Sequence, residues 1–418
     1  MTINIAQSKI RGQARVPSSK SAAHRAIIAA AIAHGDSKIC GVSECADVTA
    51  TIRAITALGA QVNYDGSCVC VRGIENPPES AVIDCGESGS TLRFMIPIAA
   101  AYGVNATFIG HGRLPERPLD DIINALTPLG IEFTADGKQN LPLKIKGRLC
   151  SDKIRIAGNV SSQYLTGTLF AQAINGGTVE LTTELQSAAY IDMTCDIISK
   201  FGGTVSVCGG SYAVGGTLCA RQMHVEGDWS AAAFFCEAAA LGGEITLGGL
   251  DPNSCQGDRE CIDIFKRMGL NVTYRNGIYT MKRGAVNAID MDAGNIPDMV
   301  PAVAVTLAFA HGKSTIYNAA RLRIKESDRL LAVSQNLGKA GIATELYDDR
   351  LVIYGGEPKS ARIDSFNDHR IAMAFASAAP FICGGLTIDG AESVSKSFPD
   401  YFTVLSSIGG DTHVLNNG

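Results

Sequence analysis

Hydrophobic residues gather in six long runs that are apolar on nearly every face of a predicted helix. The runs are "SAAHRAIIAAAIA", "STLRFMIPIAAAY", "SQYLTGTLFAQAI", "WSAAAFFCEAAAL", "MVPAVAVTLAFA" and "HRIAMAFASAA". A helix without a polar face is typical of the interior of a domain, because it has no side to present to water. The pattern therefore predicts six buried helices, distributed along the whole chain.

A strand pattern that contains or begins with glycine follows each apolar run. These stretches are "HGDSKICGV", "YGVNATFIG", "GGTVELTT", "GGEITLGG", "HGKSTIYN" and "GGLTIDG". A second helical stretch follows each of them and ends in an apolar residue and glycine, the expected helix stop. The stops are Leu58-Gly59, Leu129-Gly130, Phe201-Gly202, Met268-Gly269, Ala340-Gly341 and Ile408-Gly409. Their spacing of roughly 70 residues indicates six α/β modules.

The modules can be grouped in two ways. The hydrophilic stretch "RQMHVEGDWS" lies near the midpoint of the 418 residues and predicts a crossover between two domains of three modules each. The cleft between two such domains is the default place for a site. The alternative is one continuous solenoid of six modules, because a repeat alone does not fix its packing.

The charge composition excludes one broad class of partner. The chain carries 36 Lys and Arg against 41 Asp and Glu, a formal net charge of -5, and no block of like charge stands out. Proteins that coat nucleic acid need a basic surface, so any anion binding here must be local. The start, "MTINIAQSKIRGQARV", lacks the apolar core of a signal peptide, and "AIIAAAIA" is too short to span a bilayer. We expect a soluble cytoplasmic protein without nucleic-acid or membrane partners.

Cysteine is frequent in the chain. Of the thirteen cysteines, only Cys68 and Cys70 form a close pair, and there is no C-x-x-C motif and no histidine at ligand spacing. No metal site is therefore expected from the cysteines. In a cytoplasmic protein, we expect these cysteines to be reduced and mostly buried, and to pack as small apolar residues.

Polar stretches with a basic residue precede several of the buried helices. They are "PSSKSAAHR", "CGESGSTLR", "NVSSQYLT" and "SFNDHR", and the charged segment "RIKESDR" leads into a further amphipathic helix. The start of a helix attracts anions through its unpaired N–H groups and its dipole. The serines among them also suit simple helix caps, an alternative that each stretch alone leaves open. Together, Lys20, Arg25, Arg117, Arg329, Arg370 and Lys396 would suit substrates that carry phosphate and carboxylate groups.

Two acids lie among these cations. Glu326 stands between Lys325 and Arg329, and Asp298 lies in "NIPDMVP" directly before an apolar helix. Two carboxylates in a site with little water are able to divide acid and base roles. The alternatives are a helix cap for Asp298 and a structural ion pair for Glu326.

These motifs together resemble one family. The chain is similar to the 5-enolpyruvylshikimate-3-phosphate synthases through "PSSKSAAHRA", "CGESGSTLR", "RLPERPLDDIINAL", "VSSQYLTGTL", "SAAYIDMT", "IPDMVPA", "RIKESDRL", "NDHRIAMA" and "SKSFPDYF". The resemblance implies an α/β fold of two similar domains, each of three βαβαββ units, described as an inside-out α/β barrel. It places one domain at residues 12–227, mainly on the shikimate 3-phosphate side, and the other at 1–11 plus 228–418, with the site in the cleft.

The resemblance also implies a reaction. The enolpyruvyl group of phosphoenolpyruvate passes to the 5-hydroxyl of shikimate 3-phosphate, and phosphate is released, on the route to chorismate and the aromatic amino acids. No metal or organic cofactor is required, and the partners are the two small substrates of a monomeric enzyme. The herbicide glyphosate occupies the phosphoenolpyruvate pocket in this family.

Roles for single residues follow from the same motifs. Shikimate 3-phosphate would be held by Lys20, Ser21, Arg25, Ser161, Ser162, Gln163, Ser187, Tyr190, Asp298 and Lys325. Phosphoenolpyruvate would meet Lys20, Gly89, Arg117, Gln163, Arg329, Arg370 and Lys396. The catalytic group would be Lys20, Asp298 as acceptor of the hydroxyl proton, and Glu326 in protonating and deprotonating the methylene carbon. Asp328 is expected to brace the start of its helix.

The chain departs from the family pattern at a few positions. "GESGS" places Glu87 and Ser90 where the family commonly has an Asn-Ala-Gly-Thr or Asn-Ser-Gly-Thr sequence, and His24 replaces an asparagine. An extra carboxylate near an anionic substrate weakens binding unless a base such as Arg93 pairs with it. The affinity for phosphoenolpyruvate and the sensitivity to glyphosate therefore stay open.

Two other functions compete with this one. The related transferase that acts on UDP-N-acetylglucosamine shares the fold but usually carries a reactive cysteine where this chain has "GHGRLPERP". A two-domain binding protein without chemistry would need the cations but not the two acids. Substitution of Asp298 or Glu326 distinguishes the enzyme from the binding protein.

Overall fold

The strands of the protein form sheets of one repeated type. The computed structural model describes residues 1–135, 137 and 139–415, and within these residues there are six four-stranded sheets. In each sheet, the glycine-led strand predicted from the sequence pairs parallel with one neighbour and antiparallel with the other. These strands are β3 (Asp36–Cys40), β7 (Asn105–Ile109), β11 (Gly177–Leu181), β15 (Glu244–Gly248), β19 (Gly312–Tyr317) and β23 (Leu386–Asp389).

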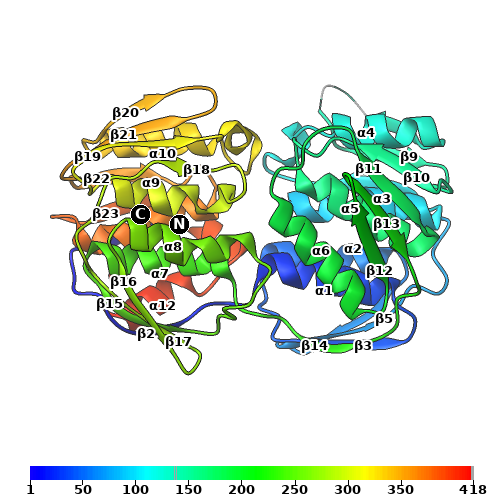
Figure 1. Cartoon of the computed structure of the whole chain (residues 1–418), viewed down its shortest axis with the longest axis horizontal. Coiled ribbons are helices and arrows are strands. Elements are labelled where there is room, and N and C mark those ends of the chain that lie inside the picture. Colours follow the sequence, from blue (N-terminus) through cyan, green and yellow to red (C-terminus); the bar gives the residue numbers. More distant parts are fainter. Residues whose placement is uncertain (136, 138, 416–418) are drawn as a thin grey trace. The chain divides into compact units, whose positions relative to one another are not determined.

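The chain divides into two compact units. Unit 1 consists of Met1–Pro17 and Glu226–Gly418, and unit 2 of Ser18–Val225. The sheets divide between them three and three, which fits two groups of modules rather than one solenoid. Figure 1 shows the units with their elements labelled.

Unit 2 contains three sheets and six α-helices among its described residues. The sheet orders are β14 (Gln222–His224), β3, β5 (Cys68–Arg72) and β4 (Gln61–Tyr64); β6 (Ser80–Asp84), β7, β9 (Leu143–Lys146) and β8 (Glu132–Ala135); and β10 (Lys153–Ile156), β11, β13 (Ser211–Gly215) and β12 (Thr204–Cys208). The helices are α1 (Lys20–Ile32), α2 (Ala46–Ala57), α3 (Gly89–Tyr102), α4 (Asp120–Leu126), α5 (Ser162–Asn175) and α6 (Ala188–Lys200), with the 3-10 turns η1 (Leu114–Glu116) and η2 (Thr127–Leu129).

Unit 1 repeats this plan in its described residues. Its sheet orders are β2 (Arg11–Arg15), β15, β17 (Ile278–Lys282) and β16 (Asn271–Arg275); β18 (Met291–Asp292), β19, β21 (Leu351–Gly355) and β20 (Ala343–Leu346); and β22 (Ala361–Asp364), β23, β1 (Thr2–Ala6) and β24 (Asp411–Leu415). The helices are α7 (Trp229–Leu241), α8 (Cys261–Arg267), α9 (Val300–Leu307), α10 (Arg329–Lys339), α11 (His369–Ala378) and α12 (Tyr401–Ser407). The 3-10 turns are η3 (Gly257–Glu260), η4 (Pro297–Met299), η5 (Ala320–Ile324), η6 (Ala379–Phe381) and η7 (Ala391–Lys396).

Two strands decide where the units begin and end. Strand β2 precedes α1 in the chain but pairs in parallel with β15 of unit 1. Strand β14 precedes α7 but pairs in parallel with β3 of unit 2. Residue 12, where the first domain is expected to begin, falls inside β2. The two compact units divide after Pro17 and after Val225, a few residues from the expected limits of 12 and 227.

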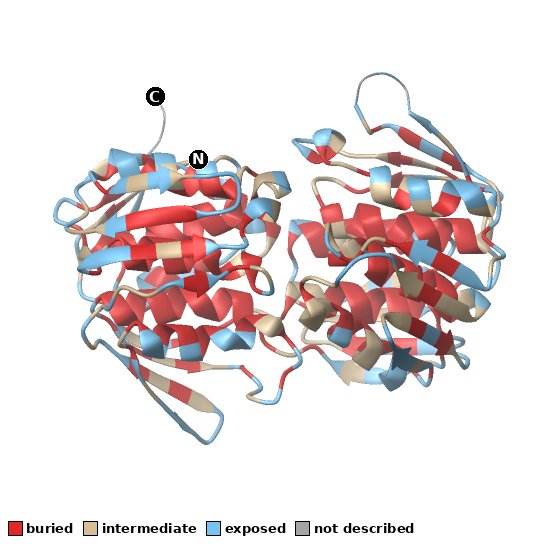
Figure 2. Ribbon diagram, turned by 45° about the horizontal axis from the view of Figure 1, so that its top comes forward, coloured by how far each residue is buried: buried red, intermediate tan, exposed pale blue. Residues whose placement is uncertain are grey.

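The six apolar runs form the buried helices that the sequence predicts. They are α1, α3 and α5 in unit 2 and α7, α9 and α11 in unit 1, and most of their residues are buried on all sides. Figure 2 shows these helices in the colour of buried residues in the interior of each unit. Each unit has its own hydrophobic core, because no face of these helices is polar enough to lie in water.

The helix stops have the predicted conformation. The glycines of all six stops, from Gly59 to Gly409, have φ between +82° and +105°. A residue with a Cβ rarely adopts this left-handed conformation, and glycine allows the chain to turn directly from the second helix of each module into the next strand. The regular occurrence of glycine in the sequence is therefore explained by the backbone.

The prediction for the cysteines is wrong in two respects. Cys40 and Cys68 form a disulfide. Of the free cysteines, Cys45, Cys85, Cys236 and Cys261 are buried, whereas Cys150, Cys208, Cys219, Cys255 and Cys383 are exposed. Spacing along the chain gave no sign of the pair, since the two residues meet only through the antiparallel register of β3 and β5.

No helix in the described residues has both the length and the apolar character to cross a membrane.

Candidate active site

Lys20 is the first residue of α1 and is held by an acid from α2. Its Nζ atom lies 2.8 Å from Oδ2 of Asp47, and the two side chains are only 13% and 9% exposed. The serine before it, Ser19, caps the helix by accepting a hydrogen bond from the backbone N–H of Ala22. The capping interpretation is thus confirmed for Ser19. The ion pair gives the partly buried ammonium of Lys20 a fixed direction.

Arg25 lies one turn further along α1 and is buried. Its guanidinium donates to the hydroxyls of Thr194 and Thr166 and to the carbonyls of Tyr190 and Ser21, at 2.8 to 3.2 Å. Burial lowers the pKa of Arg25 to about 10, so the side chain remains charged at neutral pH. These bonds tie α1 to α5 and α6 and bring Ser21 and Tyr190 to the same cation.

Ser187 precedes α6 in an unusual backbone conformation. Its φ of 57° and ψ of 46° lie in the left-handed region, and the residue is buried. Non-glycine residues in this region cost free energy and are often found at functional positions. Its carbonyl accepts from the backbone N–H of Tyr190, which brings the predicted pair Ser187 and Tyr190 together at the start of one helix.

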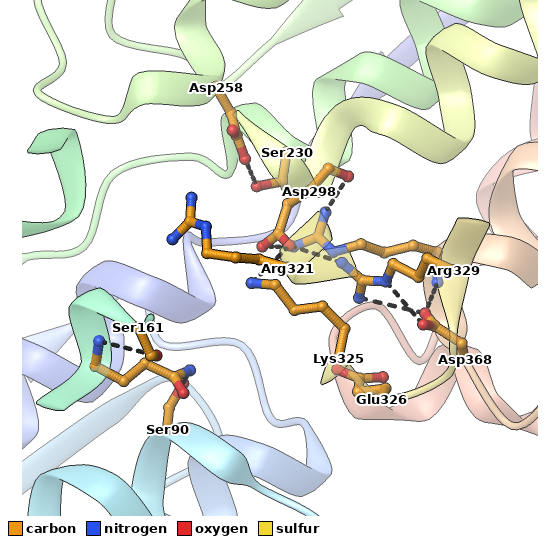
Figure 3. A network of polar contacts seen from close by, with 12 residues as sticks. Ser90, Ser161, Ser230, Asp258, Asp298, Arg321, Lys325, Glu326, Arg329 and Asp368 are labelled. Carbon is orange, nitrogen blue, oxygen red and sulfur yellow. Dashed lines mark hydrogen bonds and ion pairs between the residues drawn. The ribbon is translucent and has the colours of Figure 1, made fainter. Parts of the chain in front are cut away.

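The serines before α5 lead to a side-chain network. Ser161 caps the helix by accepting from the N–H of Gln163, as the alternative interpretation proposed. The amide oxygen of Gln163 accepts from Arg93 at 2.7 Å, and its amide nitrogen donates to Ser90 at 2.8 Å. Ser161 and Ser90, which are labelled in Figure 3, both form hydrogen bonds with Gln163. Neighbouring Ser162 is buried at the start of the helix.

Arg93 connects the same network to the segment that carries Arg117. It donates to the carbonyl of Pro118 at 3.2 Å, and its guanidinium lies 5.2 Å from the centre of the Tyr164 ring. The hydroxyl of Tyr164 donates to the same carbonyl. A planar guanidinium that both stacks and donates restricts its neighbours more than an ammonium would.

Gly89 and Arg117 approach each other closely. A Cβ atom built on Gly89 would lie 2.2 Å from a terminal nitrogen of Arg117, so only glycine leaves room for the guanidinium here. The backbone carbonyl of Arg117 accepts from the side-chain amide of Asn140. The departure Glu87 lies near this segment, since a Cβ built on Gly112 would lie 2.6 Å from its Oε2.

In unit 1, Asp298 is the centre of a cluster of cations. Its carboxylate lies 2.7 Å from Arg329, 2.9 Å from Arg370 and 3.7 Å from Lys325. Figure 3 shows Lys325 and Arg329 pointing toward Asp298. Asp298 lies inside η4 and is the N-cap residue of neither η4 nor α9, where Ile296 and Met299 hold that position, so it is not the helix cap of the alternative interpretation.

The charges around Asp298 control its protonation. Burial would raise its pKa, but the fields of Arg370, Lys325 and Arg329 outweigh burial and hold the pKa well below its ordinary value. Asp298 is therefore an anion at neutral pH. Any ligand that competes for these three cations weakens their effect and makes the carboxylate more basic.

Arg329 is shared between two acids. Its Nε donates to Oδ2 of Asp368 at 2.8 Å, and both side chains are almost completely buried. Asp368 also accepts from the hydroxyl of Ser327 and from the backbone N–H of Arg370. The pKa of Arg329 is lowered by burial and raised more strongly by Asp368 and Asp298, with the net result well above its ordinary value.

Glu326 lies beside a histidine. Its Oε2 is 2.8 Å from Nδ1 of His369, and His369 is buried. With Asp368, these residues bring three potential metal ligands within 4.8 Å of one another. However, both oxygens of Asp368 already accept hydrogen bonds from cationic or backbone donors, and Glu326 and His369 face each other. The donor set fits a hydrogen-bonded network better than a metal site.

Lys396 belongs to the same part of unit 1. It lies in η7, is buried, and donates to the carbonyl of Asn367 at 2.6 Å. Asn367 has a positive φ of 54° and directly precedes Asp368, the cap of α11. Lys396 thus reaches the start of the helix that carries Arg370.

A family model described as EPSP synthase (3-phosphoshikimate 1-carboxyvinyltransferase) matches residues 5–405. The chain belongs to the EPSP synthase family.

Relatives and solved structures agree with this assignment to the EPSP synthases. The chain is 39% identical to a 3-phosphoshikimate 1-carboxyvinyltransferase of Clostridium kluyveri, over 98% of this chain and 97% of the relative. It is 36% identical to the protein of the same name in Clostridioides difficile, over 100% and 99%. The structure of EPSP synthase from Acinetobacter baumannii matches with a TM-score of 0.82 at 27% identity, over 99% of this chain and 100% of that one. An enolpyruvyl transferase, NikO from Streptomyces tendae, has a similar fold at 16% identity and a TM-score of 0.79, over 99% and 98%. The predicted family and fold are confirmed.

The structure also reveals residues of this EPSP synthase family member that the sequence argument missed. Asp47 and Asp368 orient Lys20 and Arg329, and His369 contacts Glu326. Asp368 and His369 stand in the same "NDHR" motif as Arg370, so the sequence held a signal for them, whereas Asp47 had none.

Asp258 is a further missed residue. It lies in η3, is buried, and accepts a hydrogen bond from Ser230, while its Oδ1 has no hydrogen-bond partner among the described residues. Burial and the nearby charge of Asp298 raise the pKa of Asp258 to about 7, against the opposing effect of Arg370. Besides Asp298 and Glu326, Asp258 and Asp298 are therefore a second pair of carboxyl groups, and their pKa values differ because their neighbours differ.

Proposed function

We propose that this chain transfers the enolpyruvyl group of phosphoenolpyruvate to the 5-hydroxyl of shikimate 3-phosphate and releases phosphate. The observation that carries the proposal is Asp298, an ionised acid held by Arg329, Arg370 and Lys325. A reaction between two anionic substrates needs many cations, and proton transfer needs acids placed among them. Membership of the EPSP synthase family supports the same reaction.

The chemistry begins with a proton at carbon. Protonation of the methylene carbon of phosphoenolpyruvate produces an oxocarbenium-like centre, which the 5-hydroxyl attacks as it loses its own proton. The resulting tetrahedral ketal then loses a proton from the methyl group and expels phosphate, which restores the enol ether. We assign the hydroxyl proton to Asp298 and the proton at carbon to Glu326.

The state of Asp298 suits this role only after the substrates have bound. In the free protein, three cations keep its pKa low, which makes it a poor base. A phosphate and a carboxylate that take hydrogen bonds from Arg370 and Lys325 reduce this effect, and the pKa of Asp298 rises toward the value a base needs. Binding would thus activate the base when there is a hydroxyl to deprotonate.

Glu326 is placed to move a proton in either direction. Nδ1 of His369 either donates to the carboxylate of Glu326 or accepts from its acid form, so the hydrogen bond of 2.8 Å is available in both states. A group that first gives and then takes back a proton needs a partner of this kind. The charge of Arg329 lies close enough to interact with Glu326.

The remaining site residues are proposed to bind the substrates. Arg25, Ser21, Ser161, Ser162, Gln163, Ser187, Tyr190 and Lys325 would hold shikimate 3-phosphate, while Gly89, Arg117, Arg329, Arg370 and Lys396 would hold phosphoenolpyruvate, with Lys20 contacting both. Several of these residues, among them Lys20, Gly89, Ser162, Arg329 and Arg370, lie in the first turn of a helix, which supports an anion-binding role. The monomeric state and the cytoplasmic location likewise remain predictions.

One experiment tests the reaction directly. We would measure phosphate release from phosphoenolpyruvate with shikimate 3-phosphate in one sample and UDP-N-acetylglucosamine in another, using the parent chain and an Asp298→Asn variant. Release with shikimate 3-phosphate alone, and its near loss in the variant, is the expected result. Release only with the nucleotide sugar, or none with either substrate, would contradict the proposal.

A further inference from the structure

Cys40 and Cys68 form a disulfide and are not among the residues assigned to the reaction. Cys40 ends β3 and Cys68 begins β5, and the two are direct partners in the antiparallel register. Their neighbours Ile39 and Val69 are fully buried, whereas the two cysteines are half-buried. Since side chains alternate between the faces of a strand, the pair lies on the face of the sheet away from the core. Small reagents in the solvent are able to reach it there.

The sheet does not depend on this cross-link. Strands β3 and β5 are paired through five successive residues, from Asp36 with Arg72 to Cys40 with Cys68. Beyond the disulfide, the backbone N–H of Val42 still donates to the carbonyl of Ser67. Reduction therefore leaves the ladder of hydrogen bonds in place, and the pair is able to open and close without unfolding of the unit.

The segment next to Cys40 holds both ends of unit 2. The carbonyl of Cys40 accepts from the N–H of Val225, the last residue of the unit, at 2.8 Å. Ser43 and Ser18, the first residue of the unit, exchange two hydrogen bonds of 2.7 and 3.0 Å between their N–H groups and hydroxyls. Residues 40–43 are therefore the common anchor of the two places where the chain enters and leaves unit 2.

This anchor is packed without spare room. Gly41 has a φ of +69°, and a Cβ built on it would lie 2.3 Å from the ring of His224 in β14. The same segment continues to Asp47, the partner of Lys20, and Ser18 precedes Lys20 by two residues. A shift of residues 40–43 would thus act on both partners of the Lys20 ion pair.

We propose that Cys40 and Cys68 are a reversible thiol–disulfide site that exchanges with small thiols and disulfides, and that the oxidised pair fixes residues 40–43 as the anchor of both ends of unit 2. Cytosolic disulfides are usually of this responsive kind, because the glutathione pool reduces accessible ones. The effect on catalysis rests on the proposed function, whereas the exchange itself does not.

The exchange balances with one small disulfide as oxidant. The thiolate of one cysteine attacks the small disulfide, which forms a mixed disulfide and releases one thiolate. The second cysteine attacks the protein sulfur of the mixed disulfide, forms the Cys40–Cys68 bond and releases the second thiolate. The protein loses two electrons, the small disulfide gains them, and the two protons from the cysteines pass to the released thiolates.

The test uses the full chain equilibrated with defined ratios of reduced and oxidised glutathione. After acid quenching and alkylation, mass spectrometry should find Cys40 joined to Cys68 at oxidising ratios and both alkylated at reducing ratios, with Cys70 alkylated throughout. Amide hydrogen exchange at Ser43 and Val225 should be roughly three- to tenfold faster in the reduced protein, because the anchor is less restrained.

Matched variants separate the pair from the other thiols. Cys68→Ser should show the fast amide exchange under both conditions, and Cys70→Ser, which changes a free cysteine two residues along the same strand, should behave like the parent chain. If Cys68→Ser does not fold, the amide exchange rates of the oxidised and the reduced parent chain still decide whether the disulfide restrains the anchor. Absence of the Cys40–Cys68 peptide at every ratio, or its presence with unchanged exchange at Ser43 and Val225, would overturn the proposal.

The same samples report on catalysis. We expect phosphate release with shikimate 3-phosphate to be at least about threefold slower in the reduced protein, because Lys20 and Asp47 follow the anchor. Equal rates in the two states would show that the effect on the site is wrong. If neither state releases phosphate, the proposed function fails, while peptide mapping and amide exchange still decide the redox proposal.

Discussion

Asp298 accepts a hydrogen bond of 2.7 Å from the buried Arg329 instead of capping the helix that follows it. Arg329 in turn is fixed from its other side by Asp368, so this cation keeps an anionic partner when the charge of Asp298 is removed. An acid in such a position can be replaced by its amide with a limited loss of structure. This relationship makes the proposed base accessible to experiment.

The first prediction concerns Asp298 and Glu326. Asp298→Asn or Glu326→Gln should leave the affinity for shikimate 3-phosphate within a few fold of the parent value, while kcat falls by about 10²- to 10⁴-fold, the usual contribution of a positioned acid or base. Calorimetric titration and phosphate release measure the two quantities. Near-normal turnover in both variants would show that the acid and base assignment is wrong.

The second prediction concerns the close approach of Gly89 to Arg117. In Gly89→Ala, the new methyl group would take the place of the guanidinium, and we expect the KM for phosphoenolpyruvate to rise by about ten- to a hundredfold, as for loss of a charged hydrogen bond. Steady-state kinetics measures the change. Gly338→Ala is the control, since a Cβ there would meet open space beyond its own helix backbone, and its KM should stay at the parent value. An unchanged KM in Gly89→Ala would remove Arg117 from the proposed site.

The third prediction concerns the coupling of Arg93 to Gln163. Arg93→Lys loses the forked donor that serves both Gln163 and the carbonyl of Pro118. Arg93→Lys and Gln163→Ala should each lower kcat/KM. The loss of transition-state stabilisation in the double variant should be smaller than the sum of the two single losses, by a coupling energy of about 0.5 to 3 kcal/mol. The exposed Gln61 offers a comparison, because Gln61→Ala should combine additively with Arg93→Lys. Additivity in both cycles would mean that the network does not position Gln163.

The fourth prediction concerns the pH dependence of stability. Glu237 is fully buried in α7, neither of its carboxyl oxygens has a hydrogen-bond partner among the described residues, and burial raises its pKa well above the ordinary value. The folded state therefore binds a proton that the unfolded state loses above about pH 4.3, and stability must fall as the pH rises from there toward the folded pKa. At acidic pH, below the ordinary value, this effect is absent.

Urea unfolding followed by the fluorescence of Trp229 measures this effect, because the single tryptophan lies in the same helix. Between pH 5 and pH 8, Glu237→Gln should lose less stability than the parent by at least about 1.4 kcal/mol, the equivalent of one pKa unit. Glu357→Gln, at an exposed position, should follow the parent curve. Parallel curves for parent and Glu237→Gln would show that the buried acid is not protonated in the folded state.

Much of the architecture was predictable because it depends on local pattern. Helices such as α7 contain almost no polar residue, and the stop at Gly59 requires a left-handed residue, so each is determined within a short segment. Strand β2 shows the opposite case. Its sequence is equally compatible with either unit, and only hydrogen bonding with β15 assigns it to unit 1.

The sequence by itself determined the six modules, the family, and the cations and acids that suit two anionic substrates, since these depend on residue type, order and spacing. The tertiary structure alone decided which partner each of these residues has: Asp47 for Lys20, Asp368 for Arg329, and Cys68 for Cys40. The reason is that ion pairs and disulfides form between atoms a few ångströms apart. Residues 27 to 39 positions apart in these pairs meet only when helices and strands have packed.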